Sequence, residues 1–171
     1  MMSNTSVASV LFVCLGNICR SSTAHGVFET LLDQRGLSHR VRVDSCGTGD
    51  WHVGQAPDPR AVAEAGKRGY DLSHLRARQV RASDFRRFDY VLAMDRMNLA
   101  DLEVMCPADY AGHLGLFLPF AGEVVTEEVP DPYYGGPDGF SQVLGLVEAA
   151  SEGLLQQICA AQETPDADSA R

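Results

Sequence analysis

The stretch of residues 9–24, S-V-L-F-V-C-L-G-N-I-C-R-S-S-T-A, constrains the fold of this chain most strongly. Its first part is a short apolar run bounded by turn residues, which predicts a buried strand. Small and polar residues follow and lead directly into a segment that predicts a helix. Cys14 ends the strand, and Arg20 stands six positions later. A strand that turns at once into a helix N-terminus is a layout suited to binding an anion.

Apolar segments of strand length alternate with helical segments along the rest of the chain. We expect strands at residues 7–13, 41–45, 90–94 and 114–118. We expect helices from Ser21 or Ser22 to Gly36 and at 59–69, 96–105 and 140–159, with a short helical turn at 82–88. The expected N-caps are Ser21 or Ser22, Asp58 and Asp95. This alternation predicts an α/β fold with a parallel sheet covered on both faces, and ligands bind such sheets beyond the carboxyl ends of the strands.

The length of 171 residues predicts one domain, which we assign to residues 1–162. The segment 163–171, E-T-P-D-A-D-S-A-R, is expected to be a disordered acidic tail. A net charge of −9 disfavours sequence-independent binding to nucleic acid. No segment reaches the length of a membrane helix, and residues 1–9 lack the basic residues of a signal peptide. We therefore expect no membrane insertion.

The five cysteines are odd in number and have no spacing typical of disulfide or metal frameworks. They are Cys14, Cys19, Cys46, Cys106 and Cys159. This usage favours a reducing cytoplasm, although secretion by a route without a signal peptide stays open. We expect neither a metal nor a cofactor.

The turn between Cys14 and Arg20 has the residue types of a phosphate-binding loop. Gly16 and Asn17 tolerate positive φ angles, which allow successive N–H groups to point inward around an anion. The guanidinium of Arg20 can bind two phosphate oxygens at once. The patterns G-x4-G-K-[ST] and G-x-G-x-x-G are missing after the first strand, so the sequence supports neither a nucleoside triphosphatase nor a dinucleotide-binding fold.

Cys14 is the candidate nucleophile in this loop. The inward amides, the helix dipole and Arg20 favour its thiolate form, and the hydroxyl of Ser21 can donate a hydrogen bond to the sulfur. Attack of the sulfur on phosphorus would give a thiophosphate that water cleaves. The alternative, an ordinary buried cysteine at a strand end, explains neither the turn residues nor Arg20.

Asp131 is the candidate proton donor for the leaving group. It stands between two prolines in V-P-D-P-Y-Y-G-G, a stiff segment followed by two glycines. It could protonate a leaving oxygen and then activate the attacking water. Residue-level reasoning leaves an equal alternative open, an acidic turn residue in a solvated loop.

The segments V-C-L-G-N-I-C-R-S and D-P-Y-Y-G-G together resemble the low-molecular-weight protein tyrosine phosphatases. The likeness extends to D-S-C-G-T, W-H-V-G, H-L-R-A-R-Q and A-M-D-R-M-N-L. It implies one flavodoxin-like domain with a four-stranded parallel sheet and helices on both faces. It also implies a metal-independent hydrolase of phosphotyrosine monoesters in proteins, with Cys14 as nucleophile, Arg20 as phosphate clamp and Asp131 as general acid and base.

The resemblance also implies roles for other residues. The phosphate loop would consist of Leu15, Gly16, Asn17, Ile18, Cys19 and Ser21. Ser45 and His74 would support Asn17, with His74 in a structural role and not as a base. Trp51, Tyr133 and Tyr134 would form aromatic walls around the substrate ring, although such residues can also serve plain packing. A reversible disulfide between Cys14 and Cys19 would protect the nucleophile from over-oxidation.

Two other functions compete with this interpretation. An arsenate reductase would need a third cysteine on a mobile segment, yet residues 47–105 contain none and Cys106 follows a predicted helix. A non-catalytic phosphoprotein-binding module would keep the loop but need neither Cys14 nor Asp131. The sequence leaves the physiological substrate and the oligomeric state open.

Overall fold

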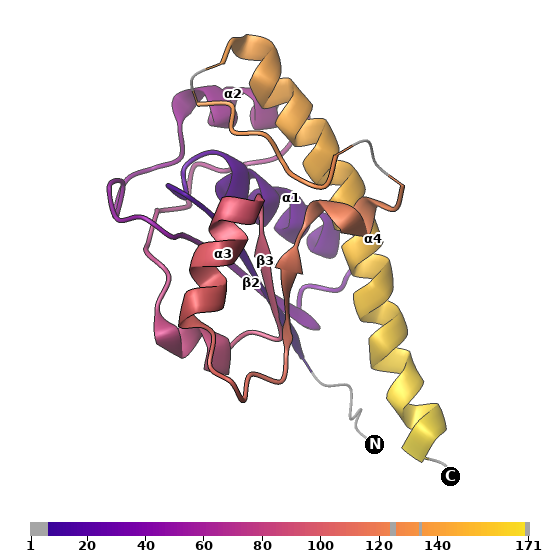
Figure 1. Cartoon of the computed structure of the whole chain (residues 1–171). Helices are drawn as coiled ribbons and strands as arrows, with labels where there is room; N and C mark the ends of the chain where they lie inside the picture. The colour runs from indigo at the N-terminus through magenta and orange to yellow at the C-terminus, as the bar shows by residue number, and fades with distance from the viewer. Residues whose placement is uncertain (1–6, 124–125, 134, 170–171) are drawn as a thin grey trace.

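The computed structural model describes residues 7–123, 126–133 and 135–169 of the chain. Its centre is a parallel sheet of four strands in the order β2-β1-β3-β4 (Figure 1). The strands are β1 (Ala8–Cys14), β2 (Val41–Gly47), β3 (Tyr90–Ala93) and β4 (His113–Leu116). The sequence order reverses at β1, which pairs with β2 on one side and with β3 on the other. This is the switch point at which parallel sheets bind ligands.

Helices cover both faces of the sheet, as the sequence predicted. They are α1 (Arg20–Gln34), α2 (Pro59–Lys67), α3 (Arg96–Met105) and α4 (Pro137–Ser169), with 3-10 turns η1 (Ala82–Arg86) and η2 (Leu118–Ala121). Helix α4 runs the length of the molecule and begins beside α2 (Figure 1). α1 and α4 pack on one face of the sheet, and α3 and η1 pack on the other.

The alternation of side chains along β1 builds both layers of the core. Val10 and Phe12 face α1 and α4, and the ring of Phe12 packs edge-on against Phe28 and Phe117 with centroids 5.8 and 4.9 Å apart. Leu11 and Val13 face the opposite layer. Because successive side chains of a strand point to opposite faces, one buried apolar strand anchors both helix layers.

The helix boundaries confirm two predicted caps and correct a third. Asp58 and Asp95 cap α2 and α3 by accepting hydrogen bonds from the backbone N–H groups of Arg60 and Asn98. Helix α1 starts earlier than expected, with Cys19 at the N-cap and no side-chain cap. Ser21 and Ser22, the expected caps, lie within the first turn of α1, where the Ser21 hydroxyl contacts the loop before the helix and the Ser22 hydroxyl donates to the carbonyl oxygen of Cys19.

The C-terminal segment also differs from the expectation of a disordered tail from residue 163. The backbone of α4 continues as helix to Ser169, and residues 170–171 lie outside the described part of the chain. Adding residues to an existing helix costs far less than nucleating one, so a long packed helix extends readily beyond its packed part.

Candidate active site

The turn after β1 is held by a strained asparagine with several partners. Asn17 adopts a φ of 60°, in the left-handed region that the sequence analysis expected of it. Its Nδ2 donates to Ser21 Oγ at 2.8 Å and to Ser45 Oγ at 3.1 Å, while its Oδ1 accepts from the backbone N–H of Arg78 at 3.1 Å. The start of α1 and two segments distant in sequence therefore keep the turn in a conformation that it would not adopt alone.

The sulfur of Cys14 lies at the base of this turn. Ser21 Oγ is 3.0 Å from it, and the backbone N–H groups of Asn17 and Ser21 donate to it at 3.3 and 3.4 Å. Cys14 is only 2% exposed. These donors stabilise negative charge on the sulfur, as the sequence analysis expected for a nucleophile.

The residues that follow β2 form hydrogen bonds with the backbone of this turn. The backbone N–H groups of Thr48 and Gly49 donate to the carbonyl oxygens of Cys14 and Leu15, both at 2.9 Å. A Cβ at Gly47 would lie 2.6 Å from the carbonyl oxygen of Leu15, closer than a side chain tolerates. The glycine in D-S-C-G-T therefore permits this close approach of two backbones.

Arg20 is buried with its guanidinium fixed by three oxygen partners. Nη1 donates to Asp95 Oδ2 at 2.6 Å and to the carbonyl oxygen of Val129 at 3.2 Å, and Nη2 lies 3.6 Å from Asp131 Oδ2. Burial alone would lower the pKa of Arg20, but the negative charges of Cys14, Asp95 and Asp131 raise it above its ordinary value. The cation is therefore permanently charged and oriented before any ligand arrives.

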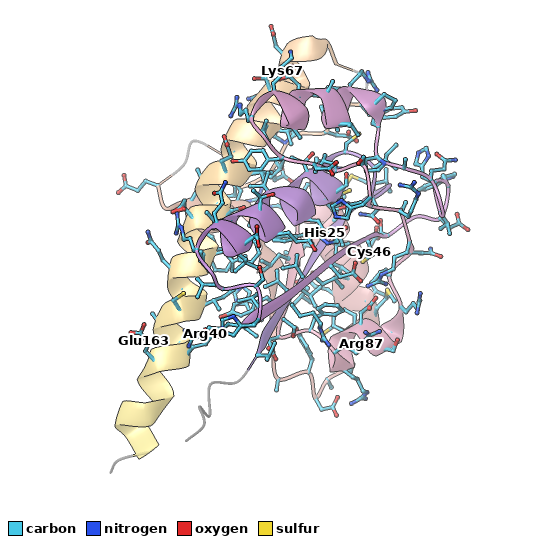
Figure 2. All side chains as sticks on the ribbon, turned by 180° about the vertical axis from the view of Figure 1, so that it is seen from behind. His25, Arg40, Cys46, Lys67, Arg87 and Glu163 are labelled. Atoms are coloured by element: carbon cyan, nitrogen blue, oxygen red, sulfur yellow. The ribbon has the colours of Figure 1, made fainter. Side chains whose placement is uncertain are left out.

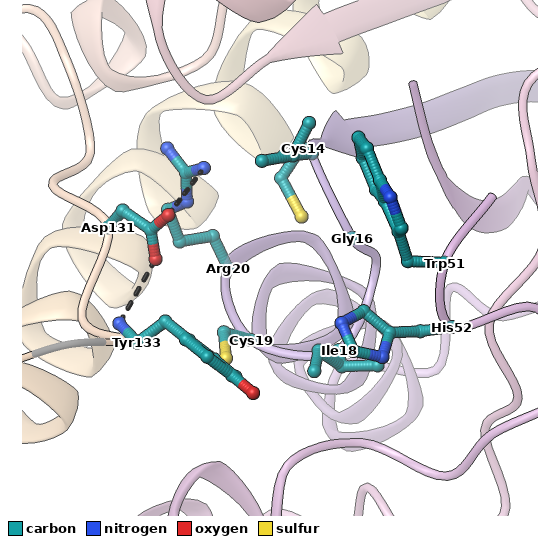
Figure 3. Close-up of a pocket in the computed structure, with 10 residues that line it drawn as sticks. Cys14, Gly16, Ile18, Cys19, Arg20, Trp51, His52, Asp131 and Tyr133 are labelled. Carbon is teal, nitrogen blue, oxygen red and sulfur yellow. Dashed lines mark hydrogen bonds and ion pairs between the residues drawn. The ribbon is translucent and has the colours of Figure 1, made fainter. Parts of the chain in front are cut away.

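A cavity of about 400 Å³ opens above the sulfur. The loop residues Leu15, Gly16, Ile18 and Cys19 form its floor together with Cys14 and Arg20. Trp51 and Tyr133 stand on opposite sides of it, as the sequence analysis expected of two aromatic walls (Figure 3). Tyr134, the third expected wall residue, lies outside the described residues.

Asp131 enters the same cavity from the loop before α4 (Figure 3). Its carboxylate is 44% exposed, and Oδ1 accepts from the backbone N–H of Tyr133 at 3.0 Å. The structure thus brings Cys14, Arg20 and Asp131 to one cavity from two segments that are more than a hundred positions apart. The nucleophile and the proton donor that the sequence analysis selected face the same space.

The support predicted from His74 is wrong, because His25 occupies that place. His25 Nδ1 is 2.8 Å from Ser45 Oγ, on the α1 surface one turn beyond Ser21 (Figure 2). His74 is exposed, and its Nε2 reaches only Glu29 Oε1 at 3.4 Å. The loop after α2 holds His74 outside the buried network, whereas the helical period turns His25 toward β2.

Glu29 joins the two histidines. Its Oε2 lies 3.3 Å from His25 Nε2, on the side away from Ser45. Burial raises the pKa of Glu29, but the hydrogen bonds and charges of His25 and His74 outweigh burial and lower it. The polar chain that supports Asn17 thus runs through Ser45 and His25 to a carboxylate at the surface.

Sequence reasoning missed two further residues of the site. Asp95 orients Arg20, and the signal was its position directly after β3, at the carboxyl edge of the sheet. His52 lines the cavity, with Nδ1 3.0 Å from Gln55 Oε1 and its ring 6.4 Å from that of Tyr133. His52 follows Trp51 in W-H-V-G, one of the segments that resemble the family, but the resemblance implied no role for this histidine.

The second cysteine of the loop is a free thiol, as is Cys14. Burial and the nearby charges of Asp58, Cys14 and Asp131 raise the pKa of Cys19 to about 12. Burial also raises the pKa of Cys46 well above its ordinary value. These two thiols are therefore protonated at neutral pH.

Two features are absent from the described residues. These residues contain no group of three or more His, Cys, Asp or Glu side chains arranged to hold a metal ion. Among the described helices, none is both long and apolar enough to cross a membrane.

The sequence matches a family of known proteins over nearly its whole length. The family described as "Low molecular weight phosphotyrosine protein phosphatase" matches residues 9–164. A protein of that description from Schizosaccharomyces pombe is 45% identical over 150 residues, covering 87% of this chain and 96% of the relative. A low molecular weight protein-tyrosine-phosphatase from Streptomyces coelicolor is 45% identical over 152 residues, covering 87% and 92%.

Solved structures show the same fold. The crystal structure of YfkJ from Bacillus subtilis superposes with a TM-score of 0.88 at 36% identity, covering 94% of this chain and all of that one. The Drosophila arginine phosphatase DARP superposes with a TM-score of 0.81 at 33% identity, covering 86% and 96%. The four-stranded parallel sheet and its helix layers are therefore shared with these proteins.

Proposed function

Because this chain belongs to the low molecular weight phosphotyrosine protein phosphatase family, we propose that it hydrolyses phosphotyrosine monoesters in proteins through a cysteinyl-phosphate intermediate. The observation that carries the proposal is the shared cavity. The sulfur of Cys14 lies at its base, the guanidinium of Arg20 at its side and the carboxyl group of Asp131 at its mouth. A phosphate ester bound in this cavity would therefore contact the nucleophile, the phosphate clamp and the proton donor at the same time.

The first step forms a sulfur–phosphorus bond and breaks the bond from phosphorus to the phenolic oxygen. The inward N–H groups of the loop and the guanidinium of Arg20 bind the three non-bridging oxygens. Asp131 delivers its proton to the departing phenolic oxygen, so that a neutral phenol leaves. The product is phosphorylated Cys14 with an ionised Asp131.

The second step returns the enzyme to its starting state. Asp131, now a carboxylate, accepts a proton from water as the water oxygen attacks phosphorus. The sulfur–phosphorus bond breaks, inorganic phosphate forms, and Cys14 leaves as a thiolate. Ser21 Oγ, 3.0 Å from the sulfur, stabilises that leaving thiolate. The 44% exposure of Asp131 supplies the access that water needs.

The walls of the cavity favour an aromatic ester. Trp51 and Tyr133 stand on opposite sides of the floor, so a phenyl ring between them can contact both faces (Figure 3). A phosphate on the shorter serine side chain would not reach the sulfur without pulling the peptide backbone into the cavity. Tyrosine-phosphorylated proteins are therefore the proposed partners.

A panel of substrates in the presence of EDTA tests this function. We expect turnover of p-nitrophenyl phosphate and of a phosphotyrosine peptide, with kcat/KM for the matching phosphoserine peptide lower by about a hundredfold or more, because the serine ester lacks the ring and the reach. A phosphoarginine peptide belongs in the panel because one structural relative is an arginine phosphatase. Preference for phosphoarginine, or dependence on added metal, would contradict the proposal.

We further propose that peroxide inactivates the enzyme reversibly. The thiolate of Cys14 would be oxidised to a sulfenic acid, and the Cys19 sulfur would then displace hydroxide to form a disulfide and, after proton transfer, water. Both cysteines line the same cavity, Cys19 in the loop that surrounds the Cys14 sulfur. A dithiol reductant should restore activity in the wild type but not in Cys19→Ser, which over-oxidises.

A further inference from the structure

We propose that Arg60 is a positioning residue that holds Tyr133 as a wall of the substrate cavity and so strengthens binding of the aromatic ring. The inference deepens the proposed function, since it concerns the ring of an aryl phosphate. Arg60 lies at the start of α2, outside the cavity lining and away from the reacting atoms. Its role would be exerted through Tyr133.

A buried carboxylate fixes the Arg60 side chain. Asp58 is 7% exposed, and its Oδ1 accepts from the backbone N–H and from Nε of Arg60, at 2.8 and 3.0 Å. Its Oδ2 accepts from Nη2 at 2.9 Å. This two-oxygen fork fixes the plane of the guanidinium, which a lysine could not do.

The fixed guanidinium faces two aromatic rings from different segments. Its Cζ lies 5.4 Å from the centroid of Tyr133 and 4.7 Å from that of Phe140. Phe140 belongs to α4 and is buried. Both distances lie within the range of about 6 Å at which a cation is attracted to a ring face. Three segments, namely α2, the loop of Asp131 and α4, therefore meet at one side chain.

Asp58 and Arg60 also connect the Tyr133 wall to the phosphate loop. The backbone N–H of Asp58 donates to the carbonyl oxygen of Ile18 at 2.8 Å. Ile18, Cys19 and Phe140 also belong to one apolar cluster, against which Tyr133 packs. Arg60 therefore links the position of the Tyr133 ring to the floor on which the phosphate binds.

The opposite wall shows what this support changes. Trp51 is 68% exposed, whereas Tyr133 is half-buried beneath Arg60. A ring that is already held in place loses less conformational entropy when a ligand stacks on it. We therefore expect removal of Arg60 to weaken binding of a ring and to leave binding of a bare phosphate unchanged.

The test compares two ligands that differ by one ring. Binding of phenylphosphonate and of inorganic phosphate is followed by the fluorescence of Trp51, the single tryptophan, which lines the cavity. Neither ligand requires turnover, so the result is independent of whether the enzyme proves to be a phosphotyrosine phosphatase. That separate question is settled by the turnover of aryl phosphates in the wild type.

We expect Arg60→Ala to weaken the binding of phenylphosphonate about three- to tenfold, as loss of a cation–ring contact implies. The affinity for inorganic phosphate should not change. Arg60→Gln should show the same loss, because it keeps a polar group near Asp58 but no charge over the ring; it also serves if the alanine variant fails to fold. Lys67→Ala is the matched control, because it removes one exposed positive charge in the last turn of α2, whose ion pair is with Glu64 of the same helix. It should change neither affinity.

A double-mutant cycle separates positioning from general stability. In a Tyr133→Leu background the further change Arg60→Ala should have less than a twofold effect on phenylphosphonate. KM for p-nitrophenyl phosphate should follow phenylphosphonate, while kcat changes less. Equal loss of phosphate and phenylphosphonate affinity, or an undiminished effect of Arg60→Ala without Tyr133, would overturn the proposal.

Discussion

The phosphate loop and the loop of Asp131 face each other across one cavity but are held in different ways. In the phosphate loop the polar side chains of Asn17, Arg20 and Ser21 are at most 3% exposed, and each has hydrogen-bond partners. The Asp131 loop is joined to the core on both sides of Asp131, by Val129, whose backbone N–H donates to Met94 O at 2.8 Å, and by Tyr133, which packs on an apolar cluster, but Asp131 itself is 44% exposed. One half is fixed in advance, and the other meets solvent.

The difference corresponds to the two tasks of the proposed reaction. Groups that stabilise developing charge act best when they need no rearrangement during the reaction. A group that first donates a proton and then accepts one from water must remain accessible. The structure therefore places rigidity where the phosphate binds and exposure where the leaving group departs and water enters.

The largest effect should come from the rigid half, through Arg20→Lys. The ammonium group cannot keep the contacts to Asp95 and Val129 and also bind two phosphate oxygens, so Asp95 loses its partner. We expect kcat/KM for p-nitrophenyl phosphate to fall about a hundredfold to a thousandfold, the scale for loss of a preorganised donor to the developing charge. Steady-state kinetics measures this, with thermal unfolding as the control for folding. A loss of kcat/KM of less than about tenfold would show that the fixed orientation of the guanidinium matters little for catalysis.

The next effect should come from the exposed half, through Asp131→Asn. The amide keeps the shape but cannot donate a proton, so the first step with phenyl phosphate, release of phenol, should slow about a hundredfold. With p-nitrophenyl phosphate the loss should be smaller, because p-nitrophenolate leaves without protonation. The measurement compares the two leaving groups in the pre-steady-state release of the phenol, because the second step, with Asp131 as its proposed base, is common to both substrates. Equal losses for both would assign the proton to another residue.

The buried thiol of Cys19, in the phosphate loop, should make disulfide formation with Cys14 dependent on pH. Because the pKa of Cys19 is raised to about 12, its thiolate fraction at neutral pH is small and grows with pH. After stoichiometric peroxide, disulfide closure should accelerate about tenfold per pH unit between pH 6 and 8. Mass spectrometry of quenched samples follows closure, with Cys19→Ser as the control. A rate independent of pH would contradict this protonation state.

The smallest effect should distinguish the two histidines at the back of the loop. His25→Ala removes the partner 2.8 Å from Ser45 Oγ, so kcat should fall about threefold and stability by about 1 kcal/mol, the net contribution of one hydrogen bond. His74→Ala should change neither quantity measurably, because His74 is exposed. Activity and denaturant unfolding of the two variants provide the comparison. A larger effect of His74→Ala than of His25→Ala would instead support the sequence-based prediction that His74 supports the loop.

The parts of the site that are local in sequence could be predicted from the sequence alone. The strand, the turn and the helix of residues 9–24 depend on neighbours, and the left-handed Asn17 and the contact from Ser21 to Cys14 followed from residue type and spacing. Asp131 is different, because the chain between it and Arg20 gives no measure of their distance. Only its resemblance to known sequences resolved what its acidic, proline-bounded loop left open.

The missed residues are those whose role depends on contacts between distant segments. Asp95 reaches Arg20 across 75 positions, and Arg60 reaches Tyr133 only because α2 and the loop before α4 are packed together. His25 could have been found, because it stands four residues after Ser21 and so shares its face of α1. The motif around His74 does not indicate which histidine turns toward Ser45.

The most direct test of the account is to trap the covalent intermediate on Cys14. The wild-type enzyme is mixed with p-nitrophenyl phosphate, quenched in acid within one turnover and digested for mass spectrometry, with Cys14→Ser treated in parallel. We expect one phosphoryl group on the peptide containing Cys14, a burst of p-nitrophenol matching the enzyme concentration, and neither signal in the variant. Turnover by Cys14→Ser at the wild-type rate, or hydrolysis by the wild type with no label on Cys14, would contradict the account.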